Sequence, residues 1–133
     1  MDTLEKKLIS HLYSGLAAYT LGIASKAYSG PFKDIIQGQG WDFAAAMGLY
    51  HVLSIPESLL FPIKNKIVKA ASVFGMLSVL EIGQYFGIYP GTFDPKDFIA
   101  YAVGVLVALG IDKIIDSQLK TSPLDIKELS TIN

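Results

Sequence analysis

The residues of this sequence that are best suited to chemistry begin inside an apolar segment, at Glu81 and Gln84. Three positions apart on a helix, they present a carboxyl group and an amide to the same neighbour. If the segment crosses a membrane, a rise of about 1.5 Å per residue places Glu81 about 12 Å deep, where an ionised group costs about 2.5 to 3.5 kcal/mol. The carboxyl group is then protonated, paired or turned to a polar cavity. Two interpretations stay open: a hydrogen bond that fixes helix packing, or a group that binds or titrates.

Two aspartates follow in the loop "PGTFDPKD". Asp94 is placed to cap a helix that begins at Pro95, and Asp97 falls where a capping box puts its acid. Carboxylates at a helix start also complement the helix dipole. The loop therefore has a mainly structural explanation, although Asp97 remains a candidate for binding.

One face of the helix predicted after this loop combines polar and small residues. Asp97 and Tyr101 share that face with Gly104 and Ala108, whose small side chains would let the helix of residues 68–89 come close. We therefore expect one polar pocket that opens outward and forms a candidate binding site. Its expected members are Glu81, Gln84, Asp97 and Tyr101.

Asp42 and two histidines are the other ionisable candidates. Asp42 could join the pocket, but the favoured interpretation is an acid in the first turn of its helix, beside Trp41. His11 and His51 are expected near the opposite end, apart from the carboxylates, which disfavours a metal site and favours hydrogen bonding between helices or at the interface. No catalytic triad, nucleotide loop or zinc-helix motif occurs in the sequence, so we predict no catalytic residue, metal or cofactor.

The composition favours a membrane protein and excludes several other classes. Hydrophobic residues make up 51% of the 133 residues and charged residues 17%, against roughly 25% in an average soluble protein. The 11 basic residues are all lysine, face 12 acids and leave a net charge of -1, so nothing indicates a nucleic-acid partner. Because cysteine is absent, disulfides, thiolate nucleophiles and thiolate metal sites are excluded.

Four segments are long and apolar enough to cross a bilayer core about 30 Å thick, which takes roughly 20 helical residues. They cover about residues 8–28, 41–61, 68–89 and 98–115. Their middles lack the charged stripe of a water-facing helix, which disfavours a soluble bundle. The sequence thus predicts an all-α integral membrane protein, with residues 1–133 forming a single domain of four transmembrane helices that ends in a polar tail, residues 116–133.

Two of these segments allow alternatives. The second is long enough only if it continues past Pro56 as a kinked helix, which we favour; Ser54 and Glu57 could instead cap a separate interfacial turn. The first segment could be a cleaved signal, but acids dilute its basic start, so a retained span is favoured. In that span Gly22 belongs to a stripe of small residues that suits close helix packing.

Lysines set the predicted orientation. With four spans, both termini and the central loop lie on one side, where most lysines gather, while the other two loops carry only Lys26, Lys33 and Lys96. By the positive-inside rule both termini are cytoplasmic. The candidate pocket then opens on the external face of the inner (cytoplasmic) membrane.

The arrangement resembles the VanZ-like family of small integral membrane proteins, as a divergent branch. The resemblance rests on "WDFAAAMGLYH", on "EIGQ" in the third span and on "GTFDPKDFIAYAVG" leading into the fourth. Glu81, Gln84, Asp97 and Gly104 match the family's glutamate-x-x-glutamine, aspartate and glycine. Many members also carry an aspartate-lysine-x-x-histidine signature at the second span and an arginine before the later aspartate. This chain has Asp42 without that histidine, and no arginine.

The resemblance implies a multi-pass protein of the bacterial cell envelope, linked in its named member to glycopeptide antibiotic resistance, and it supplies no reaction. Three classes of function stay open. The first is a protein that binds a lipid or cell-wall head group in the pocket. The second is a non-catalytic accessory subunit that partners other membrane proteins or forms a homo-oligomer. The third, least favoured, is an enzyme or proton-coupled carrier that uses Glu81.

Overall fold

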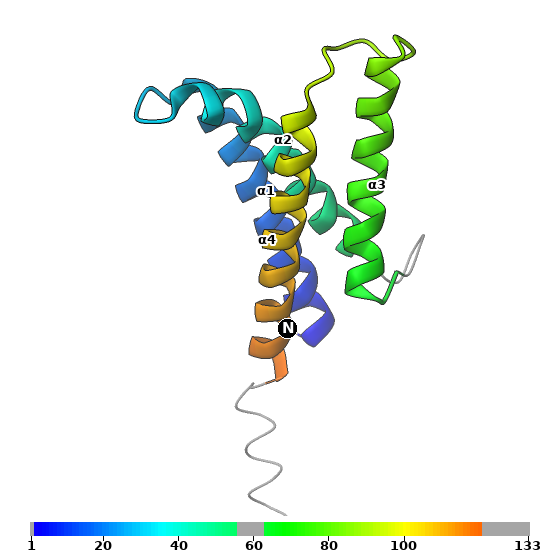
Figure 1. Cartoon of the computed structure of the whole chain (residues 1–133). Coiled ribbons are helices and arrows are strands. Elements are labelled where there is room, and N and C mark those ends of the chain that lie inside the picture. Colours follow the sequence, from blue (N-terminus) through cyan, green and yellow to red (C-terminus); the bar gives the residue numbers. More distant parts are fainter. Residues whose placement is uncertain (1, 56–62, 121–133) are drawn as a thin grey trace, which may run out of the picture.

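The computed structural model describes residues 2–55 and 63–120, and all regular structure in these ranges is helical, as the sequence predicted. The helices are α1 (Thr3–Ala27), α2 (Lys33–Ser54), α3 (Lys66–Tyr85) and α4 (Pro95–Lys120). They run alternately up and down (Figure 1). The α1–α2 turn and the α3–α4 loop lie at one end, called here the turn end. The N-terminus, the start of α3 and the last turn of α4 lie at the other, called here the terminal end (Figure 1).

Side-chain caps fix where three of the helices begin. The Asp2 carboxylate accepts from the backbone of Glu5 at 2.8 Å and the Glu5 carboxylate accepts from the backbone of Asp2 at 3.2 Å, forming a capping box on α1. Asn65 caps α3 by accepting from Ile67 and Val68. Asp94, the predicted cap of α4, accepts from the backbone N–H of Lys96 at 2.9 Å.

The second helix begins well before Trp41, where its span was expected to start. It begins at Lys33, after Phe32 in a left-handed conformation with φ 60°. The added turns contain glycine, which lowers helix stability. At Gly40 the absence of a side chain allows α1 to approach closely, because a Cβ there would overlap the side chain of Ser25 on α1. Tertiary contact therefore overrides local propensity here.

One other predicted boundary differs from the structure, and another lies outside the described residues. α4 continues to Lys120, so the start of the predicted tail, residues 116–120, is helical. The rest of that tail and the predicted kink at Pro56 lie outside the described residues.

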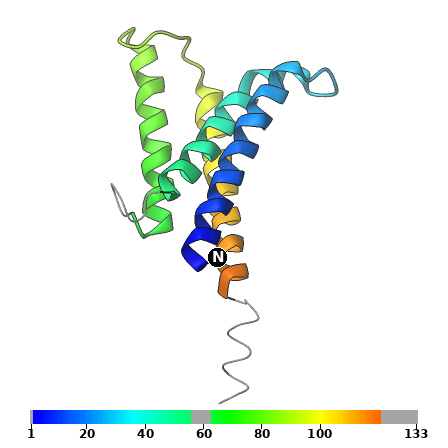
Figure 2. The ribbon, with the colours of Figure 1, turned by 180° about the vertical axis from the view of Figure 1, so that it is seen from behind.

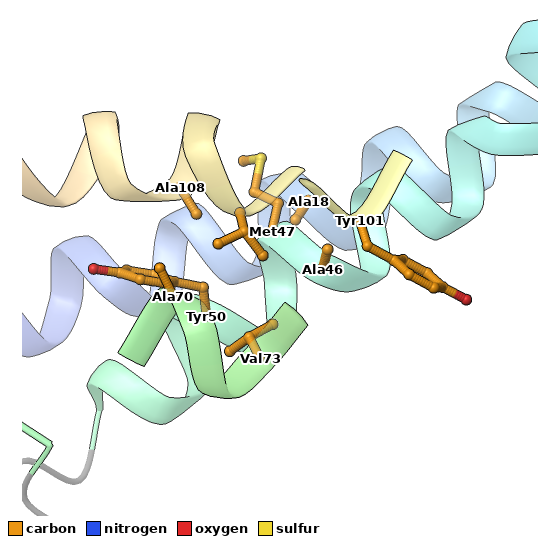
Figure 3. Close-up of a cluster of buried hydrophobic side chains, with 9 residues drawn as sticks. Ala18, Ala46, Met47, Tyr50, Ala70, Val73, Tyr101 and Ala108 are labelled. Atoms are coloured by element: carbon orange, nitrogen blue, oxygen red, sulfur yellow. The ribbon is translucent and has the colours of Figure 1, made fainter. Parts of the chain in front are cut away.

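Helix α2 is the centre of the packing, with α1 on one side and α4 on another, while α3 rests on α4 and on the lower part of α2. Figure 2 shows α3 standing apart from α1 along most of its length. Four of the nine buried core residues are alanines, whose small side chains allow the helices to approach closely (Figure 3). Its buried members are Ala18, Ala46, Met47, Tyr50, Ala70, Val73, Tyr101, Val105 and Ala108.

The predicted packing residues are in close contacts, with a partner that differs from the expected one at Gly104. A Cβ at Gly22 of α1 would lie 2.6 Å from the Trp41 ring of α2. A Cβ at Gly104 of α4 would overlap the carbonyl oxygen of Phe43 and lie 3.0 Å from Cβ of Ala46, both on α2. The expectation that Gly104 admits the third helix is therefore wrong, because the α4 face that carries it is occupied by α2. Ala108, on the same face, is fully buried in the core.

Large apolar side chains cover the outside of all four helices. Examples are Leu16 and Ile23 on α1, Val52 on α2, Val79 on α3 and Leu106 on α4, each more than half exposed. Among the described residues two helices, α3 and α4, are long and apolar enough to cross a membrane.

Candidate functional site

Glu81 in the last turns of α3 joins α3 to the start of α4. Its side chain is almost fully buried, with 2% of the residue exposed. Oε1 accepts a 2.8 Å hydrogen bond from the backbone N–H of Asp94, and Oε2 lies 3.3 Å from the hydroxyl of Tyr101 on α4. Because α3 ends at Tyr85, before the expected residue 89, Glu81 lies nearer the helix end than predicted. It is hydrogen-bonded through both oxygens and faces α4.

Asp42 on α2 meets the same hydroxyl. Its Oδ1 lies 3.5 Å from the hydroxyl oxygen of Tyr101, which therefore sits between two carboxyl groups. One hydroxyl has one proton, so it donates to Asp42 or Glu81 at a time, unless one carboxyl is protonated and donates in return. Because α2 begins at Lys33, Asp42 lies in the middle of a helix, and the favoured first-turn interpretation of this residue is wrong.

Asp94 and Asp97 are the other two carboxyl residues beside Glu81 and Asp42. The amide of Gln39 donates to Asp94 Oδ2 at 3.2 Å and, more weakly, to Asp97 Oδ1 at 3.4 Å. The carboxyl groups of Asp97 and Asp42 also lie close enough to interact with each other.

We call this set the acidic cluster: Gln39, Asp42, Glu81, Asp94, Asp97 and Tyr101. Residues from α2, α3, α4 and the α3–α4 loop converge in it at the turn end. Within residues 2–55 and 63–120, no lysine or histidine forms an ion pair with its four carboxyl groups. The cluster is therefore suited chemically to a cation or to a donor of several hydrogen bonds.

The acidic cluster contains Gln39, which the sequence analysis missed, and leaves out Gln84, which it expected. Gln84 packs against the α3–α4 loop, where a Cβ at Gly91, with φ 141°, would lie 2.5 Å from its Nε2. Gln39 precedes Asp42 by three positions, a spacing that places both on one helix face. That signal becomes visible only once α2 is known to begin at Lys33.

An apolar groove lies beside the acidic cluster. It encloses about 660 Å³ between the upper parts of α1, α2 and α4, a size typical of small-ligand pockets, which run from about 300 to 1,000 Å³. Gln39 belongs to both, since its side chain lines the groove and donates to the cluster. The groove is lined chiefly by Leu21, Ala24, Ile35, Ile36, Phe43, Ile99 and Val103, with Tyr28 and Lys96 among its few polar residues.

A second group of polar residues is buried at the terminal end, around Asp112 on α4. Its Oδ2 accepts a 2.6 Å hydrogen bond from the hydroxyl of Tyr50, and its Oδ1 lies 2.7 Å from Nζ of Lys66. Asp112 and Tyr50 are each fully buried. Lys66 also pairs with Asp116, which is partly exposed. We call this group, together with His11, His51, Ser54 and Lys69, the terminal cluster.

Both histidines belong to the terminal cluster. The Nδ1 atoms of His11 and His51 are 3.0 Å apart, so one ring donates to the other between α1 and α2. His11 Nε2 lies 3.6 Å from Oδ1 of Asp112, a carboxylate that the sequence analysis did not single out. The histidines lie at the opposite end from the acidic cluster, as expected. In the part of the chain that the structure describes, no group of three metal-ligating side chains is placed to hold a metal ion.

Lys69 is the other residue of the terminal cluster whose position the sequence did not indicate. It is fully buried, donates to Oγ of Ser54 at 2.9 Å, and its Nζ lies 5.2 Å from the centre of the Tyr50 ring. The sequence places Lys69 among the lysines of the cytoplasmic side, but its burial means that it does not contribute a charge at the membrane surface. Asp112 carried a usable signal, because it continues the face of α4 that holds Tyr101 and Ala108.

The comparisons with known proteins leave the chain without a demonstrated family. No protein-family model, no curated protein and no solved structure matches it. The resemblance to the VanZ-like family therefore stays a prediction from the sequence.

Proposed function

We propose that the protein crosses the inner membrane four times, with the terminal end cytoplasmic and the turn end external. Three observations support this. Large apolar side chains are exposed on all four helices. Within the described residues, α3 and α4 have the length and hydropathy of spans, and the helices alternate in direction. Lys6, Lys7 and Lys113 still place positive charge at the terminal end after buried Lys69 is discounted.

In this membrane, the protein binds an amine-bearing head group of a lipid or cell-wall precursor at the acidic cluster. A single observation carries the proposal. Four carboxyl groups converge at the turn end without an ion-paired cation among the described residues. Buried carboxylates without a counter-charge are costly, and an ammonium group would offset that cost with charge-assisted hydrogen bonds. The envelope location that the VanZ-like resemblance implies is consistent with such a ligand.

The test uses the purified full-length protein in mild detergent and ethanolamine phosphate as a soluble head-group probe. Binding is read from chemical-shift changes of the Asp42 and Asp97 backbone amides. We expect saturable changes that the double substitution Asp42→Asn with Asp97→Asn reduces at least fivefold. The matched control is Asp34→Asn, in the exposed first turn of α2, which leaves binding unchanged. Probe binding that is equal in all three proteins, or absent in all, refutes the proposal.

An accessory subunit is the second candidate, favoured by the open face of α3. A Cβ at Gly75 would meet nothing within 4 Å, and Met76 and Val79 beside it are more than half exposed. Such a face suits another transmembrane helix. Crosslinking from Gly75→Cys in native membranes to a second protein chain would favour this role.

A proton-coupled carrier is less well supported. The acidic cluster and the terminal cluster lie at opposite ends of α4, and between them the helices pack through Ala46, Met47, Val105 and Ala108. These side chains offer no group to pass a proton from one cluster to the other.

A further inference from the structure

We propose that the apolar groove holds an acyl chain of a zwitterionic aminophospholipid, whose ammonium group lies at the acidic cluster and whose phosphate lies at Lys96. The inference rests on the proposed function, since it names the ligand of that same site. It commits to a lipid of the surrounding bilayer as the occupant.

The groove and the acidic cluster are continuous at Gln39 and at the start of α4. Gln39 lines the groove while its amide donates to Asp94 and Asp97. Lys96 stands between these two aspartates in the sequence and also lines the groove. The carboxyl residues themselves do not line the groove, so a ligand chain in it would bring its head group to Gln39 and Lys96, next to the carboxyl groups.

Lys96 supplies the charge that makes the site zwitterionic. Its side chain is exposed and makes no ion pair in the described ranges, although carboxyl groups are its sequence neighbours. Its backbone N–H is fixed by the cap of Asp94. A cation on one side and several carboxyl groups on the other complement a phosphate and an ammonium group held a few ångströms apart in one head group.

The apolar walls match a hydrocarbon chain better than a sugar or a peptide. Leu21 of α1, Phe43 of α2, and Ile99 and Val103 of α4 line the groove over about two helical turns. A polar ligand would find few partners on these side chains. A primary ammonium group can donate three hydrogen bonds to carboxylates, whereas a quaternary ammonium group donates none. A lipid with an ethanolamine head group should therefore bind more tightly than one with a choline head group.

The experiment measures lipid retention by native mass spectrometry. Delipidated full-length protein in mild detergent is mixed with equal amounts of phosphatidylethanolamine, phosphatidylcholine and phosphatidylglycerol of identical chains. We expect phosphatidylethanolamine to be retained at least fivefold over each competitor. Ile99→Trp, which fills the groove, should lower its retention at least fivefold. Leu106→Trp is the matched control, since Leu106 is similarly exposed on α4 but does not line the groove, and it should leave retention unchanged.

A second variant tests the same inference without placing a large side chain in the groove, where it could disturb the fold. Lys96→Gln changes only an exposed side chain and should lower phosphatidylethanolamine retention at least threefold, whereas Lys113→Gln at the terminal end should not. Equal retention of the three lipids, or retention that neither Ile99→Trp nor Lys96→Gln lowers, overturns the inference. If ethanolamine phosphate still binds at the acidic cluster in that case, the groove assignment alone fails; if it does not bind, the proposed function fails too.

Discussion

Glu81 Oε1 accepts a 2.8 Å hydrogen bond from the backbone N–H of Asp94, so a buried carboxylate of α3 fixes the residue that caps α4. A glutamate inside an apolar helix thereby stabilises the loop that leads into the next helix. The same side chain reaches the Tyr101 hydroxyl with its other oxygen. Glu81 thus joins α3 to α4 through hydrogen bonds, while binding at the same carboxyl group stays a proposal.

Glu81→Leu should lower the free energy of unfolding by about 1 to 3 kcal/mol, because it leaves the Asp94 N–H without its acceptor and leaves the Tyr101 hydroxyl only the longer contact to Asp42. Glu81→Gln keeps one carbonyl oxygen and should cost less. Reversible unfolding in mixed micelles measures both. Faster hydrogen exchange at the Asp94 amide in Glu81→Leu alone would locate the effect, and equal stability of the two variants would contradict it.

Because the Tyr101 hydroxyl contacts Asp42, we expect the effects of substituting these two residues on stability to be coupled. A double-mutant cycle with Tyr101→Phe and Asp42→Asn should give an interaction energy of about 0.5 to 1.5 kcal/mol, since the two side chains share one contact. The cycle is read from unfolding free energies. Tyr19→Phe, an exposed tyrosine of α1, provides the control and should not couple to Asp42→Asn. Strictly additive effects of Tyr101→Phe and Asp42→Asn would rule the contact out.

The close approach of α4 to α2 predicts opposite outcomes for two glycines of one helix. Gly104→Ala should destabilise by about 1 to 3 kcal/mol, because its Cβ would overlap the Phe43 carbonyl oxygen. Gly110→Ala meets nothing within 4 Å and should be neutral or stabilise by up to about 1 kcal/mol through helix propensity. Thermal unfolding followed by circular dichroism compares them. If Gly104→Ala is as stable as Gly110→Ala, α4 does not cross α2 at this point.

Asp112 should be among the most sensitive positions of the protein. It accepts from Tyr50 and pairs with Lys66 in a buried setting, so Asp112→Ala should cost about 3 to 5 kcal/mol. Asp116→Ala removes a carboxylate from the same lysine, but its side chain is 28% exposed, and the cost should be at most about 1 kcal/mol. Unfolding titrations measure the difference. Comparable losses for the two variants would contradict the burial of Asp112.

The sequence predicts the helices and part of the acidic cluster well, because both depend on local periodicity. Asp97, Tyr101 and Ala108 are correctly placed on one face of α4 and turn inward together. Gln39 and Lys69 could not be placed this way. The position of Gln39 depends on the early start of α2, which the packing of Gly40 against Ser25 allows. The burial of Lys69 depends on the hydroxyl of Ser54, which comes from another helix. Such contacts are decided between helices and leave no periodic signal within one.

The proposed orientation predicts opposite labelling of the two ends of the molecule. The chain contains no cysteine, so single substitutions report without background. Ser29→Cys lies at the turn end and Gln118→Cys near the terminal end of α4, and both positions are exposed. In intact cells a membrane-impermeant thiol reagent should label Ser29→Cys, while Gln118→Cys should react only after the cells are permeabilised. The reverse pattern would place the acidic cluster on the cytoplasmic side. Labelling of both sites without permeabilisation would argue against four spans, because the crossings by α2, α3 and α4, an odd number, lie between these two positions and put them on opposite sides of the bilayer.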